Sequence, residues 1–480
     1  MKILFVSSEV YPLIKTGGLA DVAGTLPIAL KQAGVDVKIL LPAYNGVVEK
    51  LDQVDVYQEL GDPFGYGPVT ILQGTLPDSD VTVWLLDCPS LYHRDGGPYV
   101  GANGQDYGDN HLRFGLLSWA GALITQYGYL KGWQPDVTHA HDWQTGLLPA
   151  YLKSWGQKHP PVVFTIHNLQ FTGVFDRGAY GQLALSHDLY HPDGLEYYHH
   201  FSMLKAGILY SDTITTVSPT YAKEIQTPAF GYGLDGLLRA SQGKLSGILN
   251  GVDYKIWDPQ HDELISNHYS SDQLEGKLLN KRALQQHNGL DQDDSALVFG
   301  VVSRLSEQKG LDLVLGAMPE LLANANVQFV LLGSGDKRLE EGFLALAQRF
   351  PQRVGVTIGY DEPYSHLLQA GVDSLLVPSR FEPCGLTQLY ALRYGTIPLV
   401  RHTGGLADSV WEHREGWDQT GFVFSDASVE ELKSTMWRAV DAFKDMGHWQ
   451  WLMRNAMAQD FAWSQAAKDY LGLYHALNHD

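Results

Sequence analysis

The stretch ALVFGVVS at residues 296–303 decides the fold, because it opens a second series of strands and helices midway along the chain. A short apolar run rich in valine is typical of a buried strand. It is followed by the helical segment GLDLVLGAMPELL and by the strand-like runs VQFVLLGSG, VGVTIGY, DSLLVPS and IPLVRHTGG, most of which are divided by helical segments. Strands that alternate with helices predict a parallel sheet with crossover helices.

The first half of the chain carries the same pattern from its start. Residues 3–6, ILFV, form a strand-like run, and an apolar-periodic stretch at 19–30 follows a glycine-bearing loop. VTHA at 137–140 and VVFTI at 162–166 begin similar units. Because 480 residues exceed what one hydrophobic core usually organises, we predict an α/β protein with two Rossmann-like, doubly wound domains that face a central cleft.

The domain boundary is expected within residues 247–253, where turn residues mix with a short apolar run. The predicted ranges are 1–247 for the first domain and 248–460 for the second. The final segment, 461–480, carries the last helical pattern and is expected to pack back on the first domain.

The composition excludes several classes of partner. The 54 Asp and Glu residues against 34 Lys and Arg give a formal charge of −20, which argues against nucleic acid and an anionic membrane surface. Two cysteines, Cys88 and Cys384, cannot build a disulfide framework, which suits a reducing compartment. The start of the chain has no signal-peptide core, and no apolar run approaches the roughly 18 residues of a membrane span. The sequence therefore predicts a cytoplasmic protein.

The hexapeptide TGGLAD occurs twice, with starts at residues 16 and 403. In each half a glycine pair lies between a strand-like run and a helix start, where backbone N–H groups and the helix dipole attract anions. The alternative is that the glycines make a tight turn and LAD begins a helix. The repeat supports a similar architecture in the two halves more than a shared ligand.

Polar side chains follow most of the predicted strands at their carboxyl ends, which is where ligands collect in open α/β sheets. These residues are Ser8, Glu9, His141, Asp142, His167 and Asn168 in the first half, and Arg304, Lys309, Ser334, Asp336, Tyr360 and the motif RFEPCG in the second half. A cation about 4 Å from a phosphate contributes about 4 kcal/mol at an effective dielectric near 20. With Lys15, the cations Arg304 and Lys309 suit a diphosphate; the alternative is that they are solvated surface charges.

The motif SRFEPCGLTQLYALRYG places a carboxylate just before a helix. Pro383 disfavours helix at Glu382, so this carboxylate is expected in a loop. A helix is expected to begin at 385–387, and its first N–H groups could bind sugar hydroxyls or phosphate. The alternatives are that Glu382 pairs with Arg380 and that Cys384 is a small buried side chain.

Six motifs together carry a family resemblance. They are KTGGLADV, HAHDWQTGL, FTIHNLQFTG, SRLSEQKGLDL, PSRFEPCGLTQLYALRYGT and HTGGLADSV, in this order. In order and spacing they resemble the motifs of bacterial glycogen synthases, within the ADP-glucose-dependent glycogen and starch synthase family, and the similarity runs from Met1 to the last helical segment. A plastid starch synthase resembles this core too, but would normally carry a transit peptide, which is absent from this sequence.

The resemblance implies a retaining glycosyltransferase of GT-B architecture. Such an enzyme transfers glucose from ADP-glucose to the nonreducing end of an α-1,4-glucan such as glycogen. No metal ion and no cofactor are implied, because ADP-glucose is a substrate.

The same resemblance implies a role for each matching residue. Lys15 with Gly17 and Gly18 approaches the donor pyrophosphate across the cleft. Arg304 and Lys309 neutralise the departing diphosphate. Glu382 and the backbone at Cys384, Gly385 and Leu386 hold the glucose hydroxyls, and Thr387 is a further donor-binding residue. The other implied roles are that His167 lies by the anomeric centre, that Asp142 contacts the sugar, that Tyr360 faces adenine, and that Glu9 and Asn168 line the acceptor side.

The chemistry of retention raises a question about the nucleophile. Retention ordinarily indicates a carboxylate nucleophile, but the sequence shows no obvious second carboxylate paired with Glu382. We therefore expect a front-face displacement in which ADP helps to deprotonate the acceptor hydroxyl and Glu382 positions the sugar. One position departs from related retaining enzymes, which often hold the ribose with a second Glu placed after the first. Tyr390 stands there, so no ribose contact is expected from it.

Three other interpretations predict different properties. His139, His141 and Asp142 in HAHDW are metal-ligand types, but no third ligand cluster is evident. A nicotinamide oxidoreductase would need its glycine fingerprint after the first strand, and GSGDKR at 333–338 has two of three glycines and lies elsewhere. A noncatalytic glucan-binding protein could stack sugars on its 12 Trp and 25 Tyr side chains, but it would not need the carboxylate and the cations.

Overall fold

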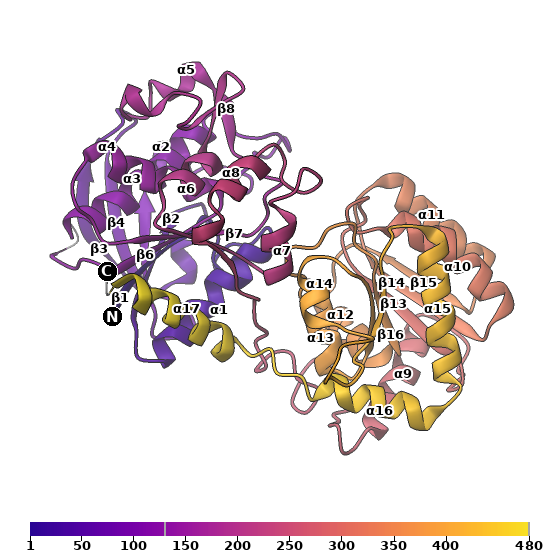
Figure 1. Ribbon diagram of the computed structural model, residues 1–480. Coiled ribbons are helices and arrows are strands. Elements are labelled where there is room, and N and C mark those ends of the chain that lie inside the picture. Colours follow the sequence, from indigo (N-terminus) through magenta and orange to yellow (C-terminus); the bar gives the residue numbers. More distant parts are fainter. Residues whose placement is uncertain (129–130, 479–480) are drawn as a thin grey trace. The chain divides into compact units, whose positions relative to one another are not determined.

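The computed structural model describes residues 1–128 and 131–478. The chain forms two compact units (Figure 1), which are Met1–Gly251 with Trp463–Asp480, called unit 1, and Val252–Ala462, called unit 2. Each unit is built around one main sheet of largely parallel strands, as the alternation of strands and helices predicts.

The division between the units falls a few residues beyond the boundaries at 247 and 460 that the sequence indicates. The chain still pairs with unit 1 at this point, because Ile248 N donates to Thr216 O at 2.9 Å. Residues 479–480 lie outside the described residues.

In the described residues the main sheet of unit 1 has nine strands, in the order β12-β11-β7-β6-β1-β2-β5-β4-β3. Their bounds are β1 Lys2–Val6, β2 Asp36–Pro42, β3 Asp52–Gly61, β4 Val69–Thr75, β5 Thr82–Asp87, β6 Val137–His141, β7 Val162–Ile166, β11 Thr213–Thr216 and β12 Leu245–Gly247. The pairs β3–β4 and β4–β5 are antiparallel, and the other neighbours are parallel. β6 and β7 are buried along their whole length, which is typical of parallel strands covered on both faces.

Helices and a small sheet complete unit 1. They are α1 Gly18–Gln32, α2 Pro89–Tyr92, α3 Asn110–Tyr127, α4 Leu147–Trp155, α5 Arg177–Tyr180, α6 Met203–Tyr210, α7 Pro219–Glu224, α8 Asp235–Ala240 and α17 Trp463–Asn478, with an antiparallel sheet β8-β10-β9 of β8 Val174–Asp176, β9 Glu196–Tyr197 and β10 His200–Ser202. The C-terminal helix α17 is tied to the centre of the main sheet, because Tyr474 OH and Nδ1 of His139 on β6 are 2.7 Å apart. In the described part of the chain, no helix combines the length and the apolar composition that a membrane span needs.

The main sheet of unit 2 is parallel throughout, in the order β15-β14-β13-β16-β17-β18. Its strands are β13 Leu297–Val302, β14 Val327–Gly333, β15 Val354–Ile358, β16 Ser374–Val377, β17 Ile397–Arg401 and β18 Phe422–Phe424. The helices are α9 Glu275–His287, α10 Leu311–Asn324, α11 Lys337–Arg349, α12 Glu362–Gly371, α13 Thr387–Arg393, α14 Gly404–Ser409, α15 Val429–Phe443 and α16 Met446–Met457. The strand at 296–303 from which the fold was predicted is β13, and it lies in the middle of this sheet.

Each main sheet has a point where the strand order reverses. In unit 1, β1 lies between β2 and β6, and in unit 2, β13 lies between β14 and β16. The chain passes from β1 to β2 and from β13 to β14 on one side, and β6 and β16, which come later in the chain, pair on the other side. At such a point the loops diverge and leave a crevice beyond the carboxyl ends of the strands.

Candidate active site

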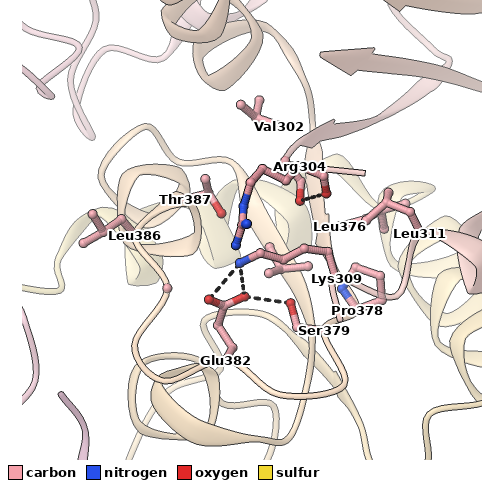
Figure 2. A pocket seen from close by; sticks show the side chains of 13 residues that line it. Val302, Arg304, Lys309, Leu311, Leu376, Pro378, Ser379, Glu382, Leu386 and Thr387 are labelled. Atoms are coloured by element: carbon pink, nitrogen blue, oxygen red, sulfur yellow. Dashed lines mark hydrogen bonds and ion pairs between the residues drawn. The ribbon is translucent and has the colours of Figure 1, made fainter. Parts of the chain in front are cut away.

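A pocket of about 180 Å³ lies at the point of reversal in unit 2 (Figure 2). Its walls come from the ends of β13 and β16 and from the loops that follow them. Six predicted site residues line it, which are Arg304, Lys309, Glu382, Gly385, Leu386 and Thr387. Strand ends that are far apart in the sequence are neighbours in the sheet, which is why the two motifs meet here.

Glu382 and Lys309 form the centre of this pocket. Lys309 Nζ donates to both oxygens of the Glu382 carboxylate, at 2.9 and 2.7 Å, and Ser379 Oγ donates to one of them at 2.8 Å. The Glu382 side chain is 7% exposed and that of Lys309 is 20% exposed. Sequence analysis missed Ser379, although its spacing of three residues from Glu382 in a loop could have indicated it.

Glu382 does not pair with Arg380, which was one alternative from the sequence. The Arg380 guanidinium instead holds the Asp312 carboxylate through two bonds of 2.7 Å. Arg380 therefore binds Asp312 outside the pocket, whereas Glu382 binds Lys309 inside it.

Arg304 adds a second cation above this pair. Figure 2 shows its guanidinium beside Lys309 Nζ and on the same side of the Glu382 carboxylate. Across the part of the chain that the structure describes, the Arg304 side chain has no hydrogen-bond or ion-pair partner, and the residue is exposed. Two cations with one carboxylate leave a net positive charge in the pocket, which favours an anionic ligand.

The loop after Glu382 leads into helix α13, which begins at Thr387. Gly385 has φ +73°, a left-handed conformation that favours glycine, and Gln388 Nε2 donates to the carbonyls of Cys384 and Gly385 at 3.0 Å each. Cys384 is buried, as one alternative from the sequence expects. Gln388 therefore holds the backbone of this loop in place, and Gly385 and Leu386 line the pocket.

The two copies of TGGLAD have different surroundings. In the second copy, Gly405 N donates to Glu382 O at 3.0 Å, and a Cβ at Gly404 or Gly405 would overlap the backbone at 382–384. These glycines let α14 approach the loop that carries Glu382. In the first copy, a Cβ at Gly17 or Gly18 would meet nothing within 4 Å. The first glycine pair is exposed and has open space beside it, which leaves room for a ligand.

Lys15 and Glu9 both make contacts within the segment that carries the first glycine pair. Lys15 Nζ holds the Asp21 carboxylate at 2.7 and 2.8 Å. Glu9, in the loop after β1, accepts hydrogen bonds from the backbone N–H groups of Thr16 and Gly17. Sequence analysis missed Asp21, although it is the last residue of the TGGLAD motif.

His167, Asp142 and His141 meet beyond the carboxyl ends of β6 and β7. His141 Nδ1 and His167 Nε2 are 2.9 Å apart, and His167 N donates to the Asp142 carboxylate at 2.7 Å. Asp142 has φ +57°, a strained conformation for a residue with a side chain. Asn168 lies beside them, and its Oδ1 accepts a bond from Gln170 N at 3.0 Å.

Burial sets the charges of this cluster. It lowers the pKa of His167 to about 3 and the pKa values of His139 and His141 well below the ordinary value, so all three rings are neutral. Burial also raises the pKa of Asp142 to about 7, although backbone N–H groups of His167 and Asn168 oppose the shift. Asp142 can therefore take up or release a proton near neutral pH, whereas the histidines act as neutral hydrogen-bonding groups.

The metal alternative at HAHDW conflicts with the contacts of His139. Its two ring nitrogens bond Tyr474 OH at 2.7 Å and Thr165 Oγ1 at 2.6 Å, so neither is available to a metal. Within the described ranges, no group of three or more His, Cys, Asp or Glu side chains is placed to hold a metal ion.

The glycines of the GSG turn at 333–335 have a packing role. A Cβ at Gly333 would overlap Ser303 O, and one at Gly335 would overlap Leu305 O. Leu305 N donates to Ser334 O at 2.8 Å. These glycines therefore bring the turn after β14 against the loop after β13.

Tyr360 and Tyr390 have contrasting surroundings. Tyr360 follows β15 and is 75% exposed. The Tyr390 ring stacks on Trp257 with ring centres 3.9 Å apart, and Trp257 stacks on His366 at 3.7 Å. This aromatic stack shows what the tyrosine at position 390 does within unit 2.

Acidification is expected to destabilise unit 1. The folded pKa values of His139, His141 and His167 lie below the unfolded value of about 6.5, so their stabilisation is present above that pH and is lost as pH falls below it. Asp142 opposes this, because its folded pKa of about 7 lies above its unfolded value and proton uptake stabilises the fold. Three losses against one gain predict a fall of about 2 kcal/mol in the free energy of unfolding between pH 6 and pH 5.

Hydrogen exchange of the full chain checks this prediction. Amides of β6 and β7 should lose protection between pH 6 and pH 5 after correction for intrinsic exchange, while β13 and β14 of unit 2 serve as the control. Unchanged protection of β6 and β7 would contradict the assignment of three neutral buried histidines.

Two family models match the chain, one in each unit. The model described as the starch synthase catalytic domain matches residues 2–240, and the model described as glycosyl transferases group 1 matches residues 282–442.

Relatives of known name match over almost the full length. The chain is 54% identical over 477 residues to a glycogen synthase of Marinomonas sp. (strain MWYL1), which covers 99% of this chain and 100% of that protein. It is 48% identical over 478 residues to a glycogen synthase of Rhodospirillum rubrum, with 99% of this chain and 98% of that protein covered.

Two solved structures have similar folds. The catalytic domain of starch synthase IV from Arabidopsis thaliana, bound to ADP and acarbose, has a TM-score of 0.89 and 32% identity, covering 100% of this chain and 99% of that chain. A sucrose-phosphate synthase from Thermosynechococcus elongatus has a TM-score of 0.61 and 18% identity, covering 99% and 98%.

Proposed function

Because the chain belongs to the glycogen synthase and starch synthase family of GT-B glycosyltransferases, we propose that it transfers glucose from ADP-glucose to the nonreducing end of an α-1,4-glucan such as glycogen. The proposal includes retention of the anomeric configuration and no requirement for a metal ion or a cofactor. The observation that carries it is the pocket in which Arg304, Lys309 and Glu382 meet. The starch synthase IV structure supports ADP as the nucleotide, because that protein binds ADP.

The proposed role of Arg304 and Lys309 is to stabilise the diphosphate as it leaves. Breaking the bond between glucose C1 and the phosphate oxygen leaves a dianion, and cations already in place stabilise it without reorganisation. They would also take over the charge neutralisation that a divalent ion supplies in other transferases. Lys309 Nζ bonds both oxygens of the Glu382 carboxylate, so the diphosphate would share this cation with the carboxylate.

The sugar and the rest of the donor are assigned to the remaining groups. Glu382 and the backbone at 384–386 bind glucose hydroxyls, and Thr387 contributes at the start of α13. Further proposed donor contacts are made by Lys15 and Gly18 to the diphosphate, by Asp142 to the sugar and by Tyr360 to adenine. Gly17 shapes the turn between Lys15 and Gly18, because its N–H donates to Glu9. His167 lies by the anomeric carbon as a neutral hydrogen-bonding group, and Asn168 lines the acceptor side.

We propose a front-face displacement for the transfer step. The acceptor oxygen forms a bond to C1 as the bond from C1 to the phosphate oxygen breaks, and the acceptor proton passes to the departing diphosphate. Among the described residues, the side chains that bond the Glu382 carboxylate are Lys309 and Ser379, and neither is a second carboxylate that could form the pair of a double-displacement glycosidase. Glu382 is then a positioning group for the sugar.

The test is transfer of labelled glucose in the presence of EDTA. The purified chain is incubated with labelled ADP-glucose and glycogen, and we expect label in the polymer and release of ADP. Absence of label in the polymer would contradict the transferase and favour a glucan-binding protein. Dependence on added Mg²⁺ would contradict the metal-independent mechanism, and a strong preference for UDP-glucose would contradict the assignment of the donor.

A further inference from the structure

The carboxylate of Glu9 is buried against the turn that precedes helix α1. Glu9 is 4% exposed. One oxygen accepts bonds from Thr16 N at 2.6 Å and Gly17 N at 3.2 Å, and the other accepts bonds from Thr16 Oγ1 and Tyr99 OH. A carboxylate with four donors around it is fully satisfied inside the protein. It therefore has no capacity left over for a sugar hydroxyl.

These bonds determine which backbone groups remain for a ligand. The N–H groups of Thr16 and Gly17 are taken by Glu9. Gly18 and Leu19 begin α1, and no earlier carbonyl of the helix can accept a bond from their N–H groups. Gly18 is exposed, and a Cβ there would meet nothing within 4 Å, so a ligand has room to approach the start of α1 at this residue. By holding the preceding two residues, Glu9 fixes the direction in which Gly18 and Leu19 point.

A second layer of contacts holds Glu9 itself in place. Tyr99 OH bonds Ser8 Oγ at 2.8 Å in addition to Glu9, and Tyr44 OH donates to Ser8 O at 2.9 Å. Burial raises the pKa of Tyr99 well above its ordinary value, so its hydroxyl stays protonated and can donate to the carboxylate. Hydrogen bonds thus connect the loop after β1, the loop of Tyr99 and the turn at Thr16.

We infer that Glu9 is a positioning residue for the nucleotide-sugar donor, and not an acceptor-binding residue as the family resemblance implies. Its carboxylate orients the Thr16–Gly17 turn, so that Lys15 and the first N–H groups of α1 meet the donor diphosphate. The inference rests on the proposed function, because it concerns the donor of that reaction. The link between Glu9 and the donor is the turn at Thr16 and Gly17, whose N–H groups donate to the Glu9 carboxylate.

The test is Glu9→Gln, which keeps the size of the side chain. A glutamine offers one acceptor oxygen and an NH₂ group that cannot accept, so it leaves part of the donor set around it unmatched. We expect KM for ADP-glucose and Kd for ADP to rise about tenfold, while KM for glycogen changes by less than about twofold. Tyr99→Phe is the matched variant: it removes one of the four bonds and should raise Kd for ADP by only about two- to threefold.

Each outcome separates the inference from the proposed function. If the wild-type protein transfers no glucose, the proposed function fails. Comparison of Kd for ADP between the wild type and Glu9→Gln still tests the role of Glu9 in that case. A rise in KM for glycogen with unchanged Kd for ADP would overturn the inference in favour of an acceptor role. Lower thermal stability with unchanged Kd and KM values would assign Glu9 to folding alone. If Glu9→Gln does not fold, Tyr99→Phe and Thr16→Val decide the matter, because unchanged Kd for ADP in both variants overturns the inference.

Discussion

Replacement of Lys309 with alanine is expected to lower kcat for glucose transfer by about 10²–10³, which corresponds to about 2.7–4 kcal/mol of transition-state stabilisation. The lysine meets the diphosphate where charge develops, so its loss affects the transition state more than the bound ground state. It also leaves the buried Glu382 carboxylate without its cation. We therefore expect a modest rise in KM for ADP-glucose beside the large fall in kcat. Steady-state kinetics with labelled ADP-glucose measures both.

Arg380→Ala is the matched control for this variant. Arg380 is also a cation in the loop of Glu382, but its guanidinium is bound to Asp312 and it does not line the pocket. Exposed pairs of this kind contribute little, so kcat should change by less than about twofold. Similar losses in both variants would show that the overall charge of the loop matters and not the position of Lys309. Equal rates for Lys309→Ala and wild type would remove Lys309 from the mechanism.

Most of the central parallel strands could be predicted because they are short apolar runs, whereas the parallel strand β11 reads TITT and carries no such signal. β14 is buried along its whole length, and β13 along nearly all of it. β3, in contrast, reads DQVDVYQELG and is mostly exposed, so neither an apolar run nor a regular alternation marks it. Its antiparallel pairing with β4 contains register shifts, which further obscure the period of two. The antiparallel edge of the sheet in unit 1 is therefore not predicted from the sequence.

The hydrogen-bond partners of the candidate site residues were harder to predict than the fact that these residues follow strand ends. Glu382 was assigned a sequence neighbour, Arg380, as a possible partner, but Lys309, 73 residues away, holds it. That contact exists because β13 and β16 are adjacent in the sheet, and strand order is not encoded in a local pattern. The partners of Glu9 were missed for a similar reason, since Tyr99 lies in a loop 90 residues away. Strand ends thus identify candidate residues, whereas the topology decides which ones touch.

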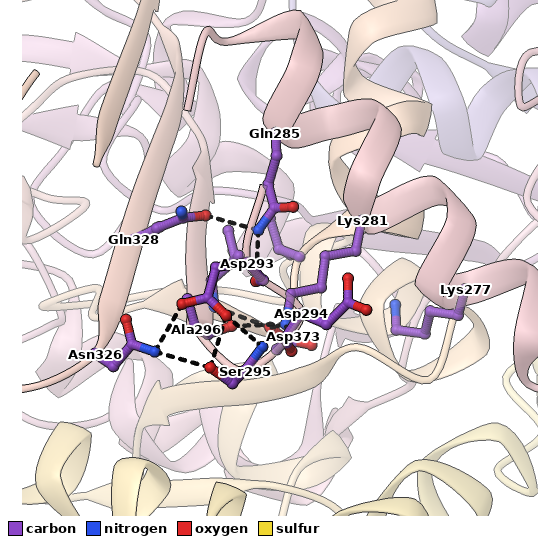
Figure 3. A network of polar contacts seen from close by, with 12 residues as sticks. Lys277, Lys281, Gln285, Asp293, Asp294, Ser295, Ala296, Asn326, Gln328 and Asp373 are labelled. Carbon is purple, nitrogen blue, oxygen red and sulfur yellow. Dashed lines mark hydrogen bonds and ion pairs between the residues drawn. The ribbon is translucent and has the colours of Figure 1, made fainter. Parts of the chain in front are cut away.

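Two buried lysines on helix α9 lead to the second prediction, which concerns the stability of unit 2 (Figure 3). Lys281 on this helix is buried, and its Nζ lies 2.8 Å from the Asp373 carboxylate and donates to Ala296 O at 2.6 Å. Asp373 and Ala296 directly precede β16 and β13, so the ion pair fastens the helix beneath the amino ends of two central strands. Lys277, one turn earlier, is also buried, but its Nζ donates to two neutral groups, Thr396 Oγ1 at 2.7 Å and Ala370 O at 3.1 Å.

Lys281→Met is expected to lower the free energy of unfolding of unit 2 by about 3–5 kcal/mol, because it leaves the buried Asp373 carboxylate without the cation that it pairs with. Lys277→Met is the matched control on the same helix. Burial lowers the pKa of Lys277 to about 7, so at pH 8 the amine is mostly neutral and its replacement removes two hydrogen bonds but no ion pair. We expect this control to cost about 1 kcal/mol. Thermal unfolding of the full chain at pH 8 should separate the variants by about 10 °C.

The partner substitution shows whether an uncompensated charge causes the loss. Asp373→Asn in the Lys281→Met background removes the charge while its side-chain oxygen can still accept the bond from Val298 N. The double variant should therefore recover most of the stability, since replacing both members of a buried pair is often close to neutral. If the double variant is as unstable as Lys281→Met, the loss comes from the missing bonds of the amine to Asp294 O and Ala296 O. Equal losses in Lys281→Met and Lys277→Met would contradict the distinction between a paired and an unpaired buried lysine.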